Sequence, residues 1–230
     1  MDTINRKGYQ IKARTNAAEI LIYEDIGENF AGGISAKQFV EDLGTVKNVE
    51  NINIRINSNG GNVFDGNTIY NALKRHKANV TVDIDGLAAS IASIIAMAGD
   101  EVRIAENGFM MIHDPWMMTG GTADDLRNAA DTMDKVRDQL VGTYVNRTGM
   151  DAKQVSDMMN EETWMNAGEA LKHGFVDSIT EDSAMAAQVR DPSRYKHTPE
   201  ALVAIDRPRS DKLKRDVQTY LAASLKQRNL

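Results

Sequence analysis

Two periodic patterns of hydrophobic and polar residues follow one another along the first half of the chain. Stretches in which apolar and polar residues alternate predict half-buried strands, and apolar residues three or four positions apart predict amphipathic helices. The predicted order is strands at 9–12 and 18–23, a helix beginning after Ser35, a strand at 51–57, a helix through Ile69 and Leu73, and strands at 80–84, 101–105 and 108–113. This succession predicts an α/β fold with a largely parallel sheet.

An almost entirely apolar stretch lies between Gly86 and Gly99, directly after the strand at 80–84. It contains only Ala, Ser, Leu, Ile and Met, which predicts a helix that is buried on every side. Ser90 would lie in its first turn, where free backbone N–H groups and the positive end of the helix dipole converge. That position can stabilise a developing oxyanion, although a serine at a helix start is also commonly a cap.

The loop after the strand at 51–57 contains Gly60 and Gly61. Because these residues lack a Cβ atom, their N–H groups can approach an oxyanion closely, or they can form an ordinary turn. Ligands of α/β sheets bind beyond the carboxyl ends of the strands, so this loop and Ser90 can face one cleft.

A long polar helix is predicted at 122–147, after Pro115. Its apolar residues, which include Leu126, Met133 and Leu140, form only a narrow seam. Such a helix cannot bury its seam within itself, so we expect it to project and to pack on another subunit. Shorter helices at 151–159 and 167–173 and a last strand at 175–179 follow.

The sequence changes character at about residue 180. From 181 to 208 the chain is polar and holds three of its four prolines, which predicts a linker or extension. Residues 211–226 have the apolar spacing of one amphipathic helix. We therefore expect one domain at 1–180 and a polar C-terminal extension at 181–230, here called the tail.

Composition narrows the chemistry and the cellular setting. The chain has 230 residues, of which 42% are hydrophobic, enough for one sizeable core. It contains no cysteine, which excludes thiol nucleophiles and cysteine-bound zinc and favours a reducing compartment, so we expect a cytoplasmic protein. We expect neither a signal peptide nor a membrane span, because the longest apolar run, 87–99, is too short. The net charge of −6 argues against a general nucleic-acid binder.

Only one of the four histidines follows an apolar strand. His113 is the last residue of the predicted strand 108–113 and directly follows its apolar run Phe-Met-Met-Ile. Its side chain therefore lies at the end of the predicted sheet. The other three lie in a charged helix end, in the last turn of a helix and in the tail: His76, His173 and His197. His113 can therefore be the base that a serine nucleophile needs, or a buried structural histidine.

A carboxylate that fixes the imidazole of His113 would complete a catalytic triad with Ser90. Asp114 adjoins His113, but neighbouring residues on an extended chain usually point to opposite sides. The distant pair Glu161 and Glu162 is therefore favoured.

Four blocks of the sequence resemble, in the same order, the proteolytic subunit family of the Clp protease. The blocks run from about Asn51 to Asp177 and are Ile-Asn-Ser-Asn-Gly-Gly at 56–61, Gly-Leu-Ala-Ala-Ser at 86–90, Met-Ile-His-Asp-Pro at 111–115 and Glu-Ala-Leu-Lys-His-Gly-Phe-Val-Asp at 169–177. The resemblance implies the α/β fold that this family shares with crotonases, in which stacked ββα units carry a projecting handle helix, here at about 122–147.

The resemblance also implies roles for single residues. It places the nucleophile, the base, the triad acid and the two oxyanion N–H donors, in that order, on Ser90, His113, Glu162, Gly61 and Ile91. The family acid is usually Asp, so Glu161 stays an alternative to Glu162. Asn59, Asp114 and Trp164 stand where housekeeping subunits usually have Pro, Gln and Phe, and with the tail they resemble the branch that phages and prophages encode beside capsid genes.

The predicted function is that of a serine endopeptidase, which cleaves proteins or peptides through an acyl-enzyme and needs no metal or cofactor. Maturation of a phage capsid or scaffold protein is one task that fits the resemblance. An apolar, adaptable substrate pocket is predicted by three methionines expected to be buried, Met97, Met110 and Met111, together with Met117 and Met118 near the site.

The partners implied by the resemblance are copies of the same chain in a ring-shaped homo-oligomer, for which two stacked rings are one arrangement. The N-terminal segment does not resemble the loops that engage an AAA+ unfoldase. Whether such an unfoldase is a partner therefore stays open. No nucleic-acid or membrane partner is expected. Two alternative functions remain: a crotonase-type acyl-CoA enzyme, and a catalytically silent structural or assembly homologue.

Overall fold

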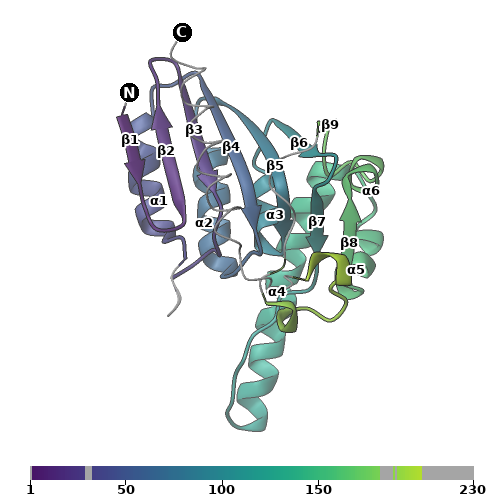
Figure 1. Ribbon diagram of the computed structural model, residues 1–230. Coiled ribbons are helices and arrows are strands. Elements are labelled where there is room, and N and C mark those ends of the chain that lie inside the picture. Colours follow the sequence, from purple (N-terminus) through teal and green to yellow (C-terminus); the bar gives the residue numbers. More distant parts are fainter. Residues whose placement is uncertain (1, 29–32, 182–188, 190, 204–230) are drawn as a thin grey trace, which may run out of the picture.

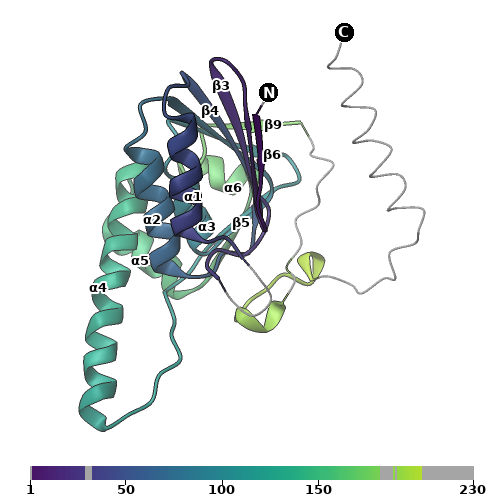
Figure 2. The same ribbon diagram turned by 90° about the vertical axis from the view of Figure 1, so that its left-hand side faces the viewer.

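The structure, a computed structural model, describes residues 2–28, 33–181, 189 and 191–203. These residues form a mixed α/β fold around a nine-stranded sheet, with α1, α2 and α3 packed on one face (Figures 1 and 2). The first half contains β1 (Asp2–Asn5), β2 (Tyr9–Ala13), β3 (Ala17–Ile22), α1 (Ala36–Leu43), β4 (Asn51–Ser58), α2 (Val63–Lys74), β5 (Asn79–Ala89) and α3 (Ile91–Ala96). The second half contains β6 (Glu101–Ala105), β7 (Phe109–Ile112), α4 (Ala123–Thr148), α5 (Ala152–Asn160), β8 (Thr163–Asn166), α6 (Ala167–Lys172) and β9 (Ser178–Thr180). The predicted α/β class is confirmed.

Strand β5 organises the sheet because it pairs with different neighbours along its length. Its first half lies parallel to β4 on one side and to β6 on the other, with Ile84 opposite Ile104. Its last residues pair instead with β7, where Ala89 lies opposite Met111. The carboxyl ends of β5 and β7 therefore meet, and the residues that follow them can touch.

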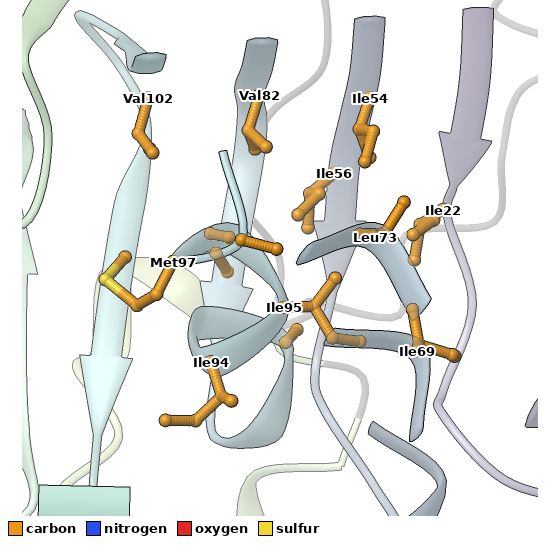
Figure 3. Packing of buried hydrophobic residues seen from close by; sticks show 14 of the residues in the cluster. Ile22, Ile54, Ile56, Ile69, Leu73, Val82, Ile94, Ile95, Met97 and Val102 are labelled. Carbon is orange, nitrogen blue, oxygen red and sulfur yellow. The ribbon is translucent and has the colours of Figure 1, made fainter. Parts of the chain in front are cut away.

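The main core lies between the sheet and the helices α2 and α3. Figure 3 shows Ile54, Ile56 and Val82 on the strands, facing Ile69 of α2 and Ile95 of α3. All five side chains are fully buried. Burial of one such side chain stabilises the fold by about 1.5–3 kcal/mol, so this layer fixes the position of α3 and of the turn that precedes it.

The stretch between Gly86 and Gly99 is not one helix, and this part of the sequence analysis was wrong. Residues 86–89 continue β5, and α3 is limited to Ile91–Ala96. Small apolar residues fit a fully buried strand as well as a buried helix, so the pattern could not separate the two. Ser90 therefore lies at the turn between a strand and a helix. The short strands β1 and β8 were also not predicted.

Helix α4 extends beyond the sheet layer (Figure 1). It begins with a capping box between Thr122 and Asp125 and ends at Gly149, which has a φ of 70°. Its buried residues all lie in the C-terminal half: Val136, Leu140, Val141 and Tyr144. Leu126, in the N-terminal half, is 46% exposed, so much of the predicted seam has no cover within the subunit.

The described part of the tail packs on the body of the molecule. Val189, Tyr195 and Leu202 are buried in a small cluster with Leu87, Ala89 and Met111. The helix predicted at 211–226 lies outside the described residues, and the division at about residue 180 stays a prediction. No helix in the described ranges has the length and apolar character needed to cross a membrane.

Candidate active site

Ser90 has a strained backbone at the turn between β5 and α3. Its φ of 54° and ψ of −130° are rare for a residue with a side chain, and strain of this kind gathers at functional sites. Three hydrogen bonds hold the turn: the Ser90 N–H donates to the Met111 carbonyl at 2.9 Å, and the Ser90 carbonyl accepts the Ser93 N–H at 3.0 Å and Ser93 Oγ at 2.5 Å. The turn is thereby fixed against both β7 and α3.

His113 follows β7 and lies against the hydroxyl of Ser90. The distance between Ser90 Oγ and His113 Nε2 is 2.8 Å, a hydrogen bond. Burial lowers the pKa of His113 below its usual 6.5, while the negative charges of Glu162 and Asp114 act in the opposite direction. A neutral imidazole at this distance can accept the Ser90 proton.

Glu162 is the acidic side chain that lies beside His113. It is 6% exposed and has a φ of 54°. Its Oε2 is 4.0 Å from His113 Nδ1, which is about 1 Å too long for a hydrogen bond. The carboxylate instead accepts the backbone N–H groups of Lys196 and His197, each at 2.7 Å, and Trp164 Nε1 at 3.2 Å. It is therefore held close to the imidazole but not in contact with it.

The other two acidic candidates are placed differently. Glu161 is exposed at the end of α5. Asp114 accepts a hydrogen bond from Arg137 Nε at 2.7 Å, which ties the end of β7 to α4. Of the three acids that the sequence analysis considered, only Glu162 has a carboxylate within 4.0 Å of His113.

The glycine loop after β4 packs directly against the Ser90 turn. A Cβ atom on Gly60, which has a φ of 89°, would lie 2.6 Å from the Ala89 carbonyl oxygen and 2.7 Å from Ser90 Cβ. Gly61 lines the same cavity as Ser90, and Ile91 begins α3, so its N–H has no partner within the helix. No backbone hydrogen bond among the described residues engages the N–H of Gly61 or Ile91, so both can donate to an oxyanion.

A cavity of about 450 Å³ opens beside Ser90 and His113. Its apolar lining includes large side chains from α2, α4, the segment after β7 and the tail: Phe64, Trp116, Met117, Met133, Val136 and Tyr195. The methionine prediction was only partly right. Met97, Met110 and Met111 are buried, as predicted, and Met117 lines the cavity, but the other four predicted methionines are not among its lining residues, and Met118 is 90% exposed.

Residues 194–197 of the tail belong to this site, and the sequence analysis missed them. The Tyr195 ring lies 5.7 Å from the His113 ring and 5.4 Å from the Trp164 ring, measured between centroids. The backbone N–H groups of Lys196 and His197 bind Glu162. The available hint was Tyr195 itself, a large aromatic residue within a polar stretch.

The fold and the site together define a class of protein. A serine on a strained turn, hydrogen-bonded to a histidine whose side chain is 11% exposed and lies beside an apolar cavity, is an arrangement suited to acyl transfer through a covalent intermediate. Within the described ranges, no group of three or more His, Asp or Glu residues is placed to hold a metal ion. The serine, the histidine and the cavity thus define a candidate site for nucleophilic chemistry in an α/β protein.

Comparison with known proteins identifies the family. Residues 5–183 match the family model described as Clp protease. Similar proteins are the ATP-dependent Clp protease proteolytic subunits of Streptococcus mutans (31% identity over 170 residues, 72% of this chain and 86% of the relative), Streptococcus equi subsp. equi (30% over 171 residues, 73% and 86%) and Streptococcus agalactiae serotype V (30% over 168 residues, 71% and 85%). The chain therefore belongs to the Clp protease family, as the four sequence blocks predicted, and this membership supports a peptidase.

Proposed function

We propose that the chain is a serine endopeptidase that cleaves proteins or peptides through an acyl-enzyme. The nucleophile, the base, the orienting acid and the two oxyanion donors are, in that order, Ser90, His113, Glu162 and the N–H groups of Gly61 and Ile91. The observation that carries the proposal is the 2.8 Å contact between Ser90 Oγ and His113 Nε2 at a strained turn beside an open cavity.

The proposed reaction begins when Ser90 Oγ attacks the scissile carbonyl carbon and its proton passes to His113 Nε2. The electron pair of the carbonyl moves to oxygen, where the N–H groups of Gly61 and Ile91 stabilise the negative charge. His113 then gives its proton to the amine nitrogen as the C–N bond breaks. Water, deprotonated by His113, releases the acyl group and restores Ser90.

Glu162 would act on His113 and not on the substrate. An imidazolium forms as His113 accepts the proton, and a carboxylate at 4.0 Å already stabilises that positive charge. A movement of about 1 Å would complete a hydrogen bond with Nδ1. Catalytic hydrogen bonds are often long in the absence of substrate and shorten when it binds.

The cavity favours an apolar side chain on the amino side of the scissile bond. Phe64, Trp116 and the two methionines Met117 and Met133 are among the large apolar side chains that line it. Methionine side chains adapt to ligands of different shape. We therefore expect cleavage after large apolar residues, with tolerance for both aliphatic and aromatic ones.

Assembly into a ring-shaped homo-oligomer, with two rings stacked through α4, is part of the proposal. Two large apolar residues that do not line the cavity support it because they are exposed in the single subunit: Met118, before α4, at 90% and Leu126, on α4, at 46%. Exposed apolar surface of this kind marks an interaction site. A second copy of α4 would cover it.

We place the chain in the phage and prophage branch of the family, with a capsid or scaffold protein as substrate. The departures at Asn59, Asp114, Glu162 and Trp164 support this assignment, as does the tail beyond the matched region. The three similar proteins are named as ATP-dependent, and a nearby ATPase gene or its absence would decide whether this chain has such a partner.

Labelling with a fluorophosphonate probe tests the proposal. We expect the probe on Ser90 in a mass-spectrometric map, no label in Ser90→Ala and slow labelling in His113→Ala. Ser178→Ala and His173→Ala are matched controls, and both should label like the wild type. Ser93 is unsuitable as a control because its hydroxyl binds the Ser90 carbonyl.

Turnover of casein or of a peptide with a large apolar residue before the scissile bond should likewise require Ser90. A folded, assembled chain that neither labels nor cleaves would contradict the peptidase. Binding of an acyl-CoA thioester by that chain would then favour the crotonase-type alternative, and no binding would favour the silent homologue.

A further inference from the structure

We propose that residues 191–203, here named the cap segment, are a positioning element of the active site that holds Glu162 beside His113 through two backbone N–H groups. The inference rests on the proposed function, since it assigns the support of the triad acid. The cap segment lies beyond residues 5–183, which match the Clp protease family. Family membership therefore does not supply this role.

The cap segment shares a small apolar core with the strand ends that carry the nucleophile and the base. Tyr195 and Leu202, 9% and 4% exposed, pack in one cluster with Ala89 and Met111. Ala89 directly precedes Ser90, and Met111 lies two residues before His113. The yellow-green segment in Figure 1 lies near the ends of β7 and β8, and Figure 2 shows it on the side of the molecule away from α4. The cap segment is thus packed against the ends of β5 and β7, the strands that precede Ser90 and His113.

Polar contacts fix the cap segment to two loops at the same end of the sheet. Arg194 forms an ion pair with Asp25, after β3, with an N–O distance of 2.6 Å. The Tyr195 hydroxyl donates to the backbone carbonyl of Asn59, in the glycine loop after β4. Both partners are separated from the cap segment by more than a hundred residues, so these contacts define its place in the tertiary structure.

The bond pattern of Glu162 shows what the cap segment does there. A carboxylate has about four acceptor sites, and Lys196, His197 and Trp164 occupy three of them. The two backbone donors bind different oxygens, at 2.7 Å each, so they fix the plane of the carboxylate as well as its position. The remaining capacity suffices for one hydrogen bond from His113 Nδ1. Without the cap segment, this buried carboxylate would lose two of its three donors.

The cap segment lines the cavity of the site but does not fill it. Tyr195 and Arg194 line the cavity beside Ser90 and His113, yet the cavity keeps a volume of about 450 Å³. The bond between Ser90 and His113 is formed with the Tyr195 ring in place. These observations favour support of catalysis over blockage of substrate.

Paired substitutions at 197 and 196 test the inference in the full-length chain. His197→Pro removes the N–H that binds Glu162, and His197→Ala keeps it. Lys196→Pro and Lys196→Ala form a second pair, and the ψ of 152° at Tyr195 is compatible with a proline at the next position. We expect each proline variant to lose about tenfold or more in kcat with KM changed less than about twofold, since hydrogen bonds to charged groups are strong. Each alanine variant keeps the backbone N–H and should therefore retain a clearly higher kcat than its proline partner.

The pH profile of kcat/KM separates positioning from general damage. The charged groups that face His113 are Glu162 and Asp114, which raise its pKa, and Arg194 and Lys196, which lower it; the neutral Ser90 and Tyr195 complete its surroundings. In His197→Pro the carboxylate moves away from the imidazole. The acid limb should therefore shift to lower pH, whereas partial unfolding would reduce the amplitude without a shift. His197→Ala should show no shift.

Three outcomes overturn the inference. The first is a proline variant with the same kcat as its alanine partner, and the second is an unshifted acid limb in His197→Pro. The third is a proline variant faster than the wild type, which would indicate that the cap segment blocks the site. Should the proline variants fail to assemble, Leu202→Ala decides, because it loosens the cap segment without touching Glu162. A lower kcat at unchanged KM supports the role, and an unchanged kcat refutes it. A wild type that neither labels nor cleaves overturns the proposed function and this inference together, whereas an active wild type isolates failure of the inference.

Discussion

A chain of hydroxyl groups connects helix α4 to the backbone of the proposed nucleophile, and it yields a prediction about stability. Ser93 Oγ donates to the Ser90 carbonyl, so its contact with the Tyr144 hydroxyl, at 2.7 Å, must have Tyr144 as the donor. Tyr144 is 2% exposed and Ser93 is fully buried. Neither hydroxyl can exchange its partner for bulk water.

The two single substitutions and the double one should therefore not be additive. Ser93→Ala leaves the Tyr144 hydroxyl buried without its acceptor, which should lower the free energy of unfolding by about 2 kcal/mol. Tyr144→Phe removes the donor and leaves Ser93 bonded to the Ser90 carbonyl, at a cost of about 1 kcal/mol. The double variant leaves no buried polar group without a hydrogen-bond partner, so we expect a loss of about 1 kcal/mol and not the sum of about 3 kcal/mol.

Urea unfolding at one fixed subunit concentration measures these differences, since oligomerisation makes apparent stability depend on concentration. The sharpest expected result is that the double variant Ser93→Ala/Tyr144→Phe is more stable than Ser93→Ala alone. Additive losses would show that the two hydroxyls act independently. The hydrogen-bonded chain from α4 to Ser90 would then be refuted.

Two further predictions concern the glycine loop and the pH dependence of activity. Gly60→Ala should destabilise the fold by about 2 kcal/mol or more and slow the labelling of Ser90, because Gly60 has a φ of 89° and the new Cβ would collide with Ala89 and Ser90. The control is Gly44→Ala, since Gly44 has a φ of −60° and open space around it. This variant should be neutral or stabilising in the same urea series. Neutral His113 is the active form and burial lowers its pKa, so activity should persist as the pH falls through 6.5 and decline only below it. A kcat/KM profile with its acid midpoint above 6.5 would contradict that explanation, and Glu162→Gln, which removes a charge that raises the pKa, should move the midpoint further down.

The elements that the sequence predicted well are those whose two faces differ in polarity. Helix α1 begins after Ser35, as expected, and in β4 every second residue is buried while the residues between are half-buried or exposed. The stretch from Gly86 to Gly99 lacks such a contrast because it is buried on all sides. There the period disappears, and a continuation of β5 was mistaken for part of a helix.

The candidate site was predictable where side chains carry its chemistry. Ser90 and His113 were found from their residue types and from their positions after strands, and the structure brings them to 2.8 Å. For the triad acid, geometry favoured the pair Glu161 and Glu162 over Asp114, and the resemblance then pointed to Glu162. Its separation of 4.0 Å from His113 depends on local backbone geometry, which no spacing in the sequence encodes.

The cap segment marks the physical limit of prediction from residue types. Its contacts with Glu162 are made by the backbone N–H groups of residues 196 and 197, and every residue except proline has such a group. Selection for these bonds would therefore leave the side chains at both positions free to vary and would exclude only proline. A role of this kind leaves no motif, so the few large apolar residues that fix the segment, such as Tyr195 and Leu202, are the features by which related tails could be identified.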